Sequence, residues 1–121
     1  MKINFDEAYE AVKDIQSREN APMSDHIIKL QEEVGEIAES YLLMSGYKNP
    51  KLSIDEERLH LTEEAVDAII VSMAILNSNK ASKNYVEHLL KIKIEKWNVE
   101  FEKKKNSKLE SQKIKTKNEN Y

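Results

Sequence analysis

The most constraining feature of this chain is an almost continuous run of apolar residues from Ala65 to Leu76, interrupted only by Asp67 and Ser72. Set in helix-forming sequence, this run predicts a helix that is apolar on nearly all sides. Such a helix has to be surrounded by other elements. Because a chain of 121 residues supports only one modest core, we expect some of those elements to come from a second copy of the protein.

The rest of the chain also favours helices. It contains only two Gly and two Pro, too few for the many tight turns of a β-rich fold. Apolar residues recur at spacings of three and four from the N-terminus to about Arg18, up to about Gly46, and again from about Lys83 to Lys104. Residues 46–53 are expected to form a polar loop. We therefore expect an all-α fold, an oligomeric bundle of four helices.

Several helix boundaries are marked by capping residues. Asn4 or Asp6 can cap the first helix, and Ser24 or Asp25 the second. Gly46 is suited to the left-handed conformation that often follows the end of a helix. At the start of the third helix, Ser53 is followed three residues later by a glutamate, Glu56, which is the pattern of a capping box.

Charge is distributed unevenly along the chain. Residues 102–121 contain seven Lys and three Glu, a charge of +4, and the remainder carries −7. We expect residues 1–105 to form the folded domain and residues 106–121 a basic, flexible tail. An acidic domain argues against nucleic acid as a partner and suits a protein that binds cations.

Several classes of site and location are excluded by composition and pattern. The absence of cysteine excludes disulfides, thiolate metal sites and cysteine nucleophiles. No apolar run reaches the length of a membrane span, and no secretory signal opens the sequence. We therefore expect a cytoplasmic protein without a membrane partner.

Two pairs of carboxylates are the candidates for chemistry: Glu33 with Glu36, and Glu64 with Asp67. Residues three apart lie about 60° apart around a helix, so each pair can converge on one point. Glu33 and Glu36 lie off the centre of their helix's apolar stripe, as residues of a solvated face do. Asp67 lies within an apolar run, where an unpaired carboxylate is costly if buried. Together the two pairs would form a pocket of oxygen ligands, which Mg2+ prefers.

The order and spacing of these acids resemble a known signature. Glu32-Glu33-x-x-Glu36, a gap of 27 residues and Glu64-x-x-Asp67 resemble the EExxE…ExxD pattern of the MazG-like, all-α nucleoside triphosphate pyrophosphohydrolases. The resemblance covers about residues 24–100. It implies a four- or five-helix domain that works as a homodimer or homotetramer. It further implies Mg2+-dependent cleavage of a (d)NTP to a (d)NMP and pyrophosphate, with Mn2+ as a substitute.

The resemblance also implies roles for individual residues. The metal ligands it implies are Glu33, Glu36, Glu64 and Asp67. A carboxylate that the metal does not fully engage, Glu32 or Glu33, can accept the proton of the attacking water. Basic and amide side chains that can meet the substrate are Lys29, Lys93, Lys96 and Asn98. The last three depart from the family's commoner Lys-x-x-x-Asn-x-x-Arg form, because no Arg follows.

Three alternatives are open. A dUTP- or dCTP-specific pyrophosphatase, or a phosphoribosyl-ATP pyrophosphohydrolase, belongs to the same superfamily and would share the metal ligands. A ferritin-like di-metal bundle needs Glu-x-x-His on two helices, and this chain has it once, at Glu57 and His60. A non-catalytic module would use the third helix only to dimerise.

Overall fold

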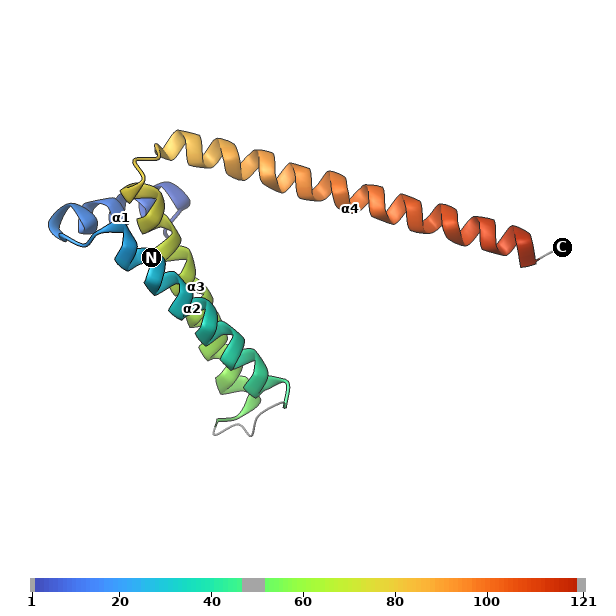
Figure 1. Ribbon diagram of the computed structural model, residues 1–121, viewed down its shortest axis with the longest axis horizontal. Coiled ribbons are helices and arrows are strands. Elements are labelled where there is room, and N and C mark those ends of the chain that lie inside the picture. The colour runs from blue at the N-terminus through green and yellow to red at the C-terminus, as the bar shows by residue number, and fades with distance from the viewer. Residues whose placement is uncertain (1, 47–51, 120–121) are drawn as a thin grey trace. The chain divides into compact units, whose positions relative to one another are not determined.

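The computed structural model describes residues 2–46 and 52–119, and within these ranges the chain is all-α. The four helices are α1 (Phe5–Arg18), α2 (Met23–Met44), α3 (Ile54–Ser78) and α4 (Lys83–Glu119) (Figure 1). The described residues contain no strand. The predicted all-α class is therefore confirmed. Most of the predicted loop, residues 47–51, lies outside the described residues.

The chain divides into two compact units. The first, Met1–Ser82, contains α1, α2 and α3, and the second, Lys83–Tyr121, contains α4. The predicted division of the chain near residue 105 stays a prediction.

Two of the predicted capping residues, Asn4 and Ser53, cap the helices α1 and α3. Asn4 accepts a hydrogen bond from the Glu7 amide at 2.9 Å and so caps α1. Ser53 caps α3 by accepting from the Glu56 amide at 3.1 Å. The Ser53 hydroxyl also lies 3.3 Å from the Glu56 carboxylate. Each side chain satisfies an amide that the first turn of a helix leaves without a partner.

The start of α2 differs from the prediction. The residue that precedes the helix is Pro22, and no side chain caps it. Ser24 and Asp25 lie inside the first turn instead, so their assignment as caps is wrong. Proline is well suited to this place because its missing N–H group is not needed at a helix start. At the other end, Gly46 has a φ of +87°, the left-handed conformation that the sequence predicts there.

α1 is held to α3 by polar contacts around one buried aromatic residue. Tyr9 is 1% exposed, stacks on Phe5 with ring centroids 5.6 Å apart, and donates a hydrogen bond to the Ala81 carbonyl at 2.9 Å. Gln16 donates to the Ala74 carbonyl at 2.9 Å and lies 3.1 Å from the Ser78 hydroxyl. These contacts connect α1 with the C-terminal half of α3 and the turn after it.

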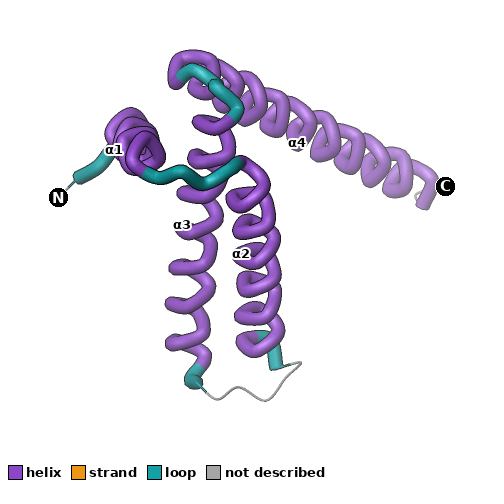
Figure 2. Tube along the Cα trace, turned by 60° about the vertical axis from the view of Figure 1, so that its left-hand side comes forward, coloured by secondary structure: helices purple, strands orange, loops and turns teal. Residues whose placement is uncertain are grey.

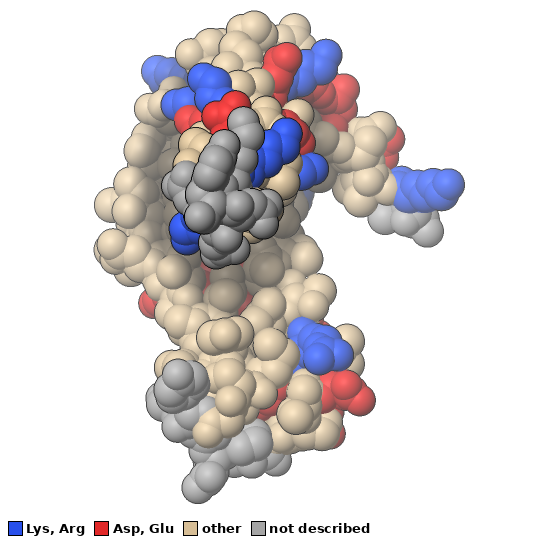
Figure 3. Space-filling model, turned by 90° about the vertical axis from the view of Figure 1, so that its right-hand side faces the viewer, with Lys and Arg blue, Asp and Glu red and all other residues tan. Residues whose placement is uncertain are grey.

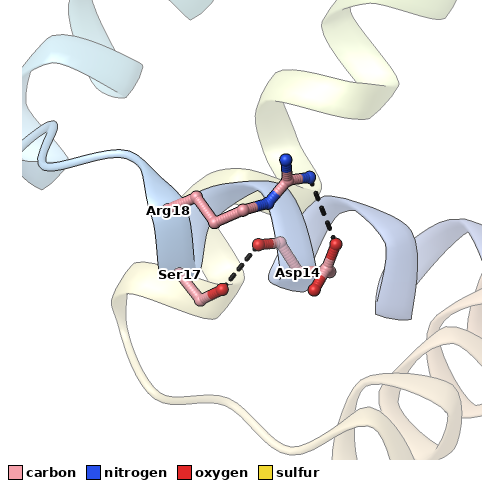
Figure 4. Close-up of polar contacts among 3 residues, drawn as sticks. All are labelled: Asp14, Ser17 and Arg18. Carbon is pink, nitrogen blue, oxygen red and sulfur yellow. Dashed lines mark hydrogen bonds and ion pairs between the residues drawn. The ribbon is translucent and has the colours of Figure 1, made fainter.

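The last turn of α1 carries a local polar network on its exposed side (Figure 4). The Ser17 hydroxyl donates to the Asp14 carbonyl at 2.6 Å, and Arg18 pairs with the Asp14 carboxylate at 3.2 Å. Because both side chains of this ion pair are mostly exposed, its contribution to stability is small.

α2 and α3 lie side by side as an antiparallel pair (Figures 1 and 2). The fully buried polar residues of the pair are Glu33, Ser40 and Glu57. Many of its apolar side chains are exposed instead, and one face is largely uncharged (Figure 3). On α3, Val66, Ile69 and Ile70 are each exposed by close to half or more. The expectation that α3 is surrounded on all sides is therefore not met within the first unit.

α4 is longer than predicted. It spans 37 residues and continues to Glu119, so the expected helix end near Lys104 is wrong. Residues 105–119 contain no Gly or Pro, and five of the fifteen are Lys, a residue that favours helix. None of the helices in the described part of the chain has the length and apolar character needed to span a membrane.

Candidate metal centre

The centre of the α2–α3 pair is built around a buried carboxylate. Glu33 is only 3% exposed, whereas its neighbour Val34 is 56% exposed. The covered side of α2 therefore includes Glu33 together with Leu30 and Ile37, whereas Glu32 and Glu36 are exposed. This corrects the assignment of Glu33 to a solvated face, which rested on the apolar stripe of α2 alone.

Three carboxylates meet at this point. Glu33 from α2 and Glu64 and Asp67 from α3 each place one oxygen within 4.8 Å of the others. Glu64 and Asp67 can do so because residues three apart lie on one side of a helix. Glu36, one turn after Glu33, also comes within hydrogen-bonding reach of Glu64. Three of the four proposed ligands thus form the cluster, and Glu36 adjoins it through Glu64. Glu33 is buried and Glu64 half-buried, whereas Glu36 and Asp67 are exposed, so the expected burial of Asp67 is not found.

The crowding changes how these groups bind protons. The pKa of Glu64 is raised to about 8. The largest cause is its hydrogen bonding to the Glu36 and Glu33 carboxylates, followed by burial and then by repulsion from the charges of these two groups. The pKa of Glu33 is lowered, first by the hydrogen bond from Glu64 and then by that from Lys29. At neutral pH, Glu64 is therefore protonated and donates a hydrogen bond to a neighbouring carboxylate. Glu33 is ionised.

Lys29 provides the nearest positive charge. Its ammonium group lies 3.1 Å from Glu33 and 3.4 Å from Glu32. These two hydrogen bonds, with Glu33 the larger cause, raise the pKa of Lys29 above its usual value. About half of the Lys29 side chain is exposed, and so is that of Glu32. Lys29 therefore orients Glu33 from the solvent side and neutralises part of its charge.

The arrangement fits a hard divalent cation. One oxygen of Glu33 and one of Glu64 are buried without a hydrogen-bond partner, and buried polar atoms are rarely left unpaired. The three clustered donors are all carboxylates, the ligand type that Mg2+ and Mn2+ favour. A cation bound here would pair the buried oxygens and offset the repulsion among these carboxylates.

The remaining candidate residues lie on α4. Lys93, Lys96 and Asn98 are all exposed, and Asn98 lines a shallow hollow together with Ile94, Trp97 and Phe101. Their contact with a substrate stays a prediction.

One buried acid was not recognised as a candidate from the sequence. Glu57 on α3 is 3% exposed, and one of its carboxylate oxygens has no hydrogen-bond partner. In the sequence it was considered only as half of a Glu-x-x-His motif. Glu57 precedes Glu64 by seven residues, which is about two turns along the same side of α3. This spacing is the sequence feature that points to Glu57.

A separate hollow of about 290 Å3 lies where α1 meets the adjoining ends of α2 and α3. Its polar lining includes Lys13, Gln16, His26 and Asn77, and none of the clustered carboxylates lines it. Gln16 is already engaged there by α3. The hollow is therefore not part of the carboxylate cluster.

Comparison with known proteins adds no relative: no family model, no curated protein and no solved structure matches the chain.

Proposed function

We propose that this chain is a Mg2+-dependent nucleoside triphosphate pyrophosphohydrolase of the MazG-like, all-α type. The observation that carries the proposal is Glu33, a buried carboxylate with an unpaired oxygen, within 4.8 Å of Glu64 and Asp67. Three of the four acids that the EExxE…ExxD resemblance implies as ligands, Glu33, Glu64 and Asp67, lie in this cluster, which supports the proposal. A solvated acidic face would give neither the burial nor the convergence.

The reaction is the addition of water to a phosphorus of the substrate, with cleavage of the bond between the α- and β-phosphates. The products are a nucleoside monophosphate and pyrophosphate. Mg2+, when bound, supplies positive charge to the phosphate oxygens and lowers the pKa of a coordinated water. Glu33, Glu36, Glu64 and Asp67 would hold it.

The proton that water loses needs an acceptor among the nearby side chains. Glu33 has a lowered pKa, which makes it a weak base and suits it to the role of ligand. Glu32 is exposed and is held by Lys29 at 3.4 Å. We therefore assign proton acceptance to Glu32, with Lys29 fixing the positions of both carboxylates.

The substrate's phosphates need positively charged groups in addition to a metal ion bound by the carboxylates. Lys93 and Lys96 with Asn98 are the groups we propose for this, all exposed on α4. We further propose a homodimer or homotetramer, because the α2–α3 pair leaves large apolar side chains exposed that a second copy would cover.

A substrate panel tests the proposal. Purified protein is incubated with each common NTP and dNTP and Mg2+, and pyrophosphate and orthophosphate are measured separately. We expect pyrophosphate and monophosphate from at least one triphosphate, and no turnover when EDTA removes the metal. A strong preference for dUTP, dCTP or phosphoribosyl-ATP would identify one of the specific activities of the same superfamily. No turnover of any triphosphate would contradict the enzyme proposal and favour a non-catalytic helical module.

A further inference from the structure

α4 presents a line of large apolar side chains that its own unit leaves uncovered. Four residues recur at spacings of four, three and four, which places them on one side of the helix: Leu90, Ile94, Trp97 and Phe101. We call them the α4 stripe. They are between 43% and 75% exposed, and three of them line a hollow of about 300 Å3. Because helices in proteins owe most of their stability to the packing of such a face, the stripe needs a partner.

We propose that this partner is α4 of a second copy, paired antiparallel about a two-fold axis near residues 95 and 96. The stripe's spacings of four, three and four read the same in both directions. When one helix is reversed, Ile94 therefore packs against Trp97 of the second copy, and Leu90 against Phe101 of the second copy. Two-fold symmetry repeats each contact, as in any isologous interface.

The charges beside the stripe support the antiparallel direction. Lys93 directly precedes Ile94 and Glu100 directly precedes Phe101, so both charges lie on the same flank. In the antiparallel register, Lys93 of each copy comes beside Glu100 of the other, which gives two pairs of opposite charge. A parallel pair would place Lys104, the next position of the stripe, against its own copy, where like charges repel.

Apolar variants of the full-length chain test the surface. Sedimentation equilibrium measures self-association, and the emission of Trp97, the only tryptophan, reports its burial in the wild type. We expect Ile94→Ala and Trp97→Ala each to weaken association by about tenfold or more. Ile92→Ala is the matched control, because Ile92 lies on the opposite side of α4 and is similarly exposed. Circular dichroism confirms that each variant is folded.

Charge reversal tests the direction. Lys93→Glu and Glu100→Lys each place like charges together in the antiparallel register, so each should weaken association. The double variant restores opposite pairs and should recover it. In a parallel pair, the double variant would still bring residue 100 beside Lys105 of the second copy and would not recover. Lys103→Glu is the control, because it makes the same change of charge at a position that lies away from the α4 stripe.

This pairing does not depend on the carboxylate cluster, so it can hold in a chain without pyrophosphohydrolase activity. A wild-type chain that stays monomeric would overturn it, since the stripe would then be covered within one chain or not at all. It is equally overturned if the stripe variants associate like the wild type, because association would then depend on the exposed apolar side chains of the α2–α3 pair alone. A double charge variant no better than the single ones would overturn the antiparallel register.

Discussion

Replacing Glu33 by glutamine is expected to reduce pyrophosphate release by about a hundredfold or more, while the helical circular dichroism signal is unchanged. The amide keeps the shape of the side chain but loses the charge that binds a divalent cation. Glu33 is buried and places a carboxylate oxygen within 4.8 Å of oxygens of Glu64 and Asp67, so it contributes one of the three clustered donors. Asp67→Asn should have the same effect for the same reason.

The stability of the metal-free variant should also change. Glu33→Gln removes the charge that accepts hydrogen bonds from Glu64 and Lys29 and whose pKa is lowered, so metal-free Glu33→Gln should unfold at a temperature equal to or below that of the wild type at pH 8. Glu63→Gln is the matched control, because Glu63 is exposed on α3 directly beside the cluster. Full activity of Glu33→Gln or Asp67→Asn would contradict the assignment of the metal site.

The second large effect is the pH dependence of the metal-free protein and of its affinity for metal. The pKa of Glu64 is raised from its ordinary value of 4.5 to about 8. Between these values the folded chain keeps a proton that the unfolded chain loses. The stabilisation is therefore complete below about pH 4.5 and is lost as the pH rises to about 8. The lowered pKa of Glu33 acts only at lower pH, where its contribution is lost on acidification.

Thermal unfolding in EDTA from pH 5 to pH 8.5 measures this effect. The unfolding temperature of the wild type should fall relative to that of Glu64→Gln, which cannot lose the proton. Because metal has to displace that proton, affinity for Mn2+ should rise by about tenfold per pH unit below pH 8. If wild type and Glu64→Gln have parallel pH profiles, Glu64 does not hold a proton at neutral pH.

Local signals in the sequence predicted much of the fold. Asn4 and Ser53 act through hydrogen bonds to amides three residues away, and Gly46 through its own backbone conformation. Such features are readable because they depend on neighbouring residues only. The wrong prediction at Ser24 and Asp25 also concerns a local feature. Both residue types are common helix caps, but α2 begins directly after Pro22.

The candidate site was predictable in its residues but not in its burial. The i, i+3 spacing correctly indicates that Glu64 and Asp67 share one side of α3. Which side of α2 meets α3 depends on the partner helix, and the apolar pattern of α2 did not place Glu33 on it. Glu33 is buried and Val34 exposed because α3 covers the side of α2 that carries Leu30, Glu33 and Ile37. The exposed apolar side is understandable if another molecule covers it, which a single sequence does not contain.

Thermal unfolding of the wild type with and without Mg2+ is the most direct test of the carboxylate cluster as a cation site. A ligand that binds only the folded state stabilises it by about 2.7 kcal/mol at about a hundred times its Kd. We expect the unfolding temperature of the wild type at pH 8 to rise with Mg2+ concentration, and that of Glu33→Gln to stay constant. An unfolding temperature of the wild type that does not respond to Mg2+, or an equal rise in Glu33→Gln, would contradict a metal site at Glu33, Glu64 and Asp67.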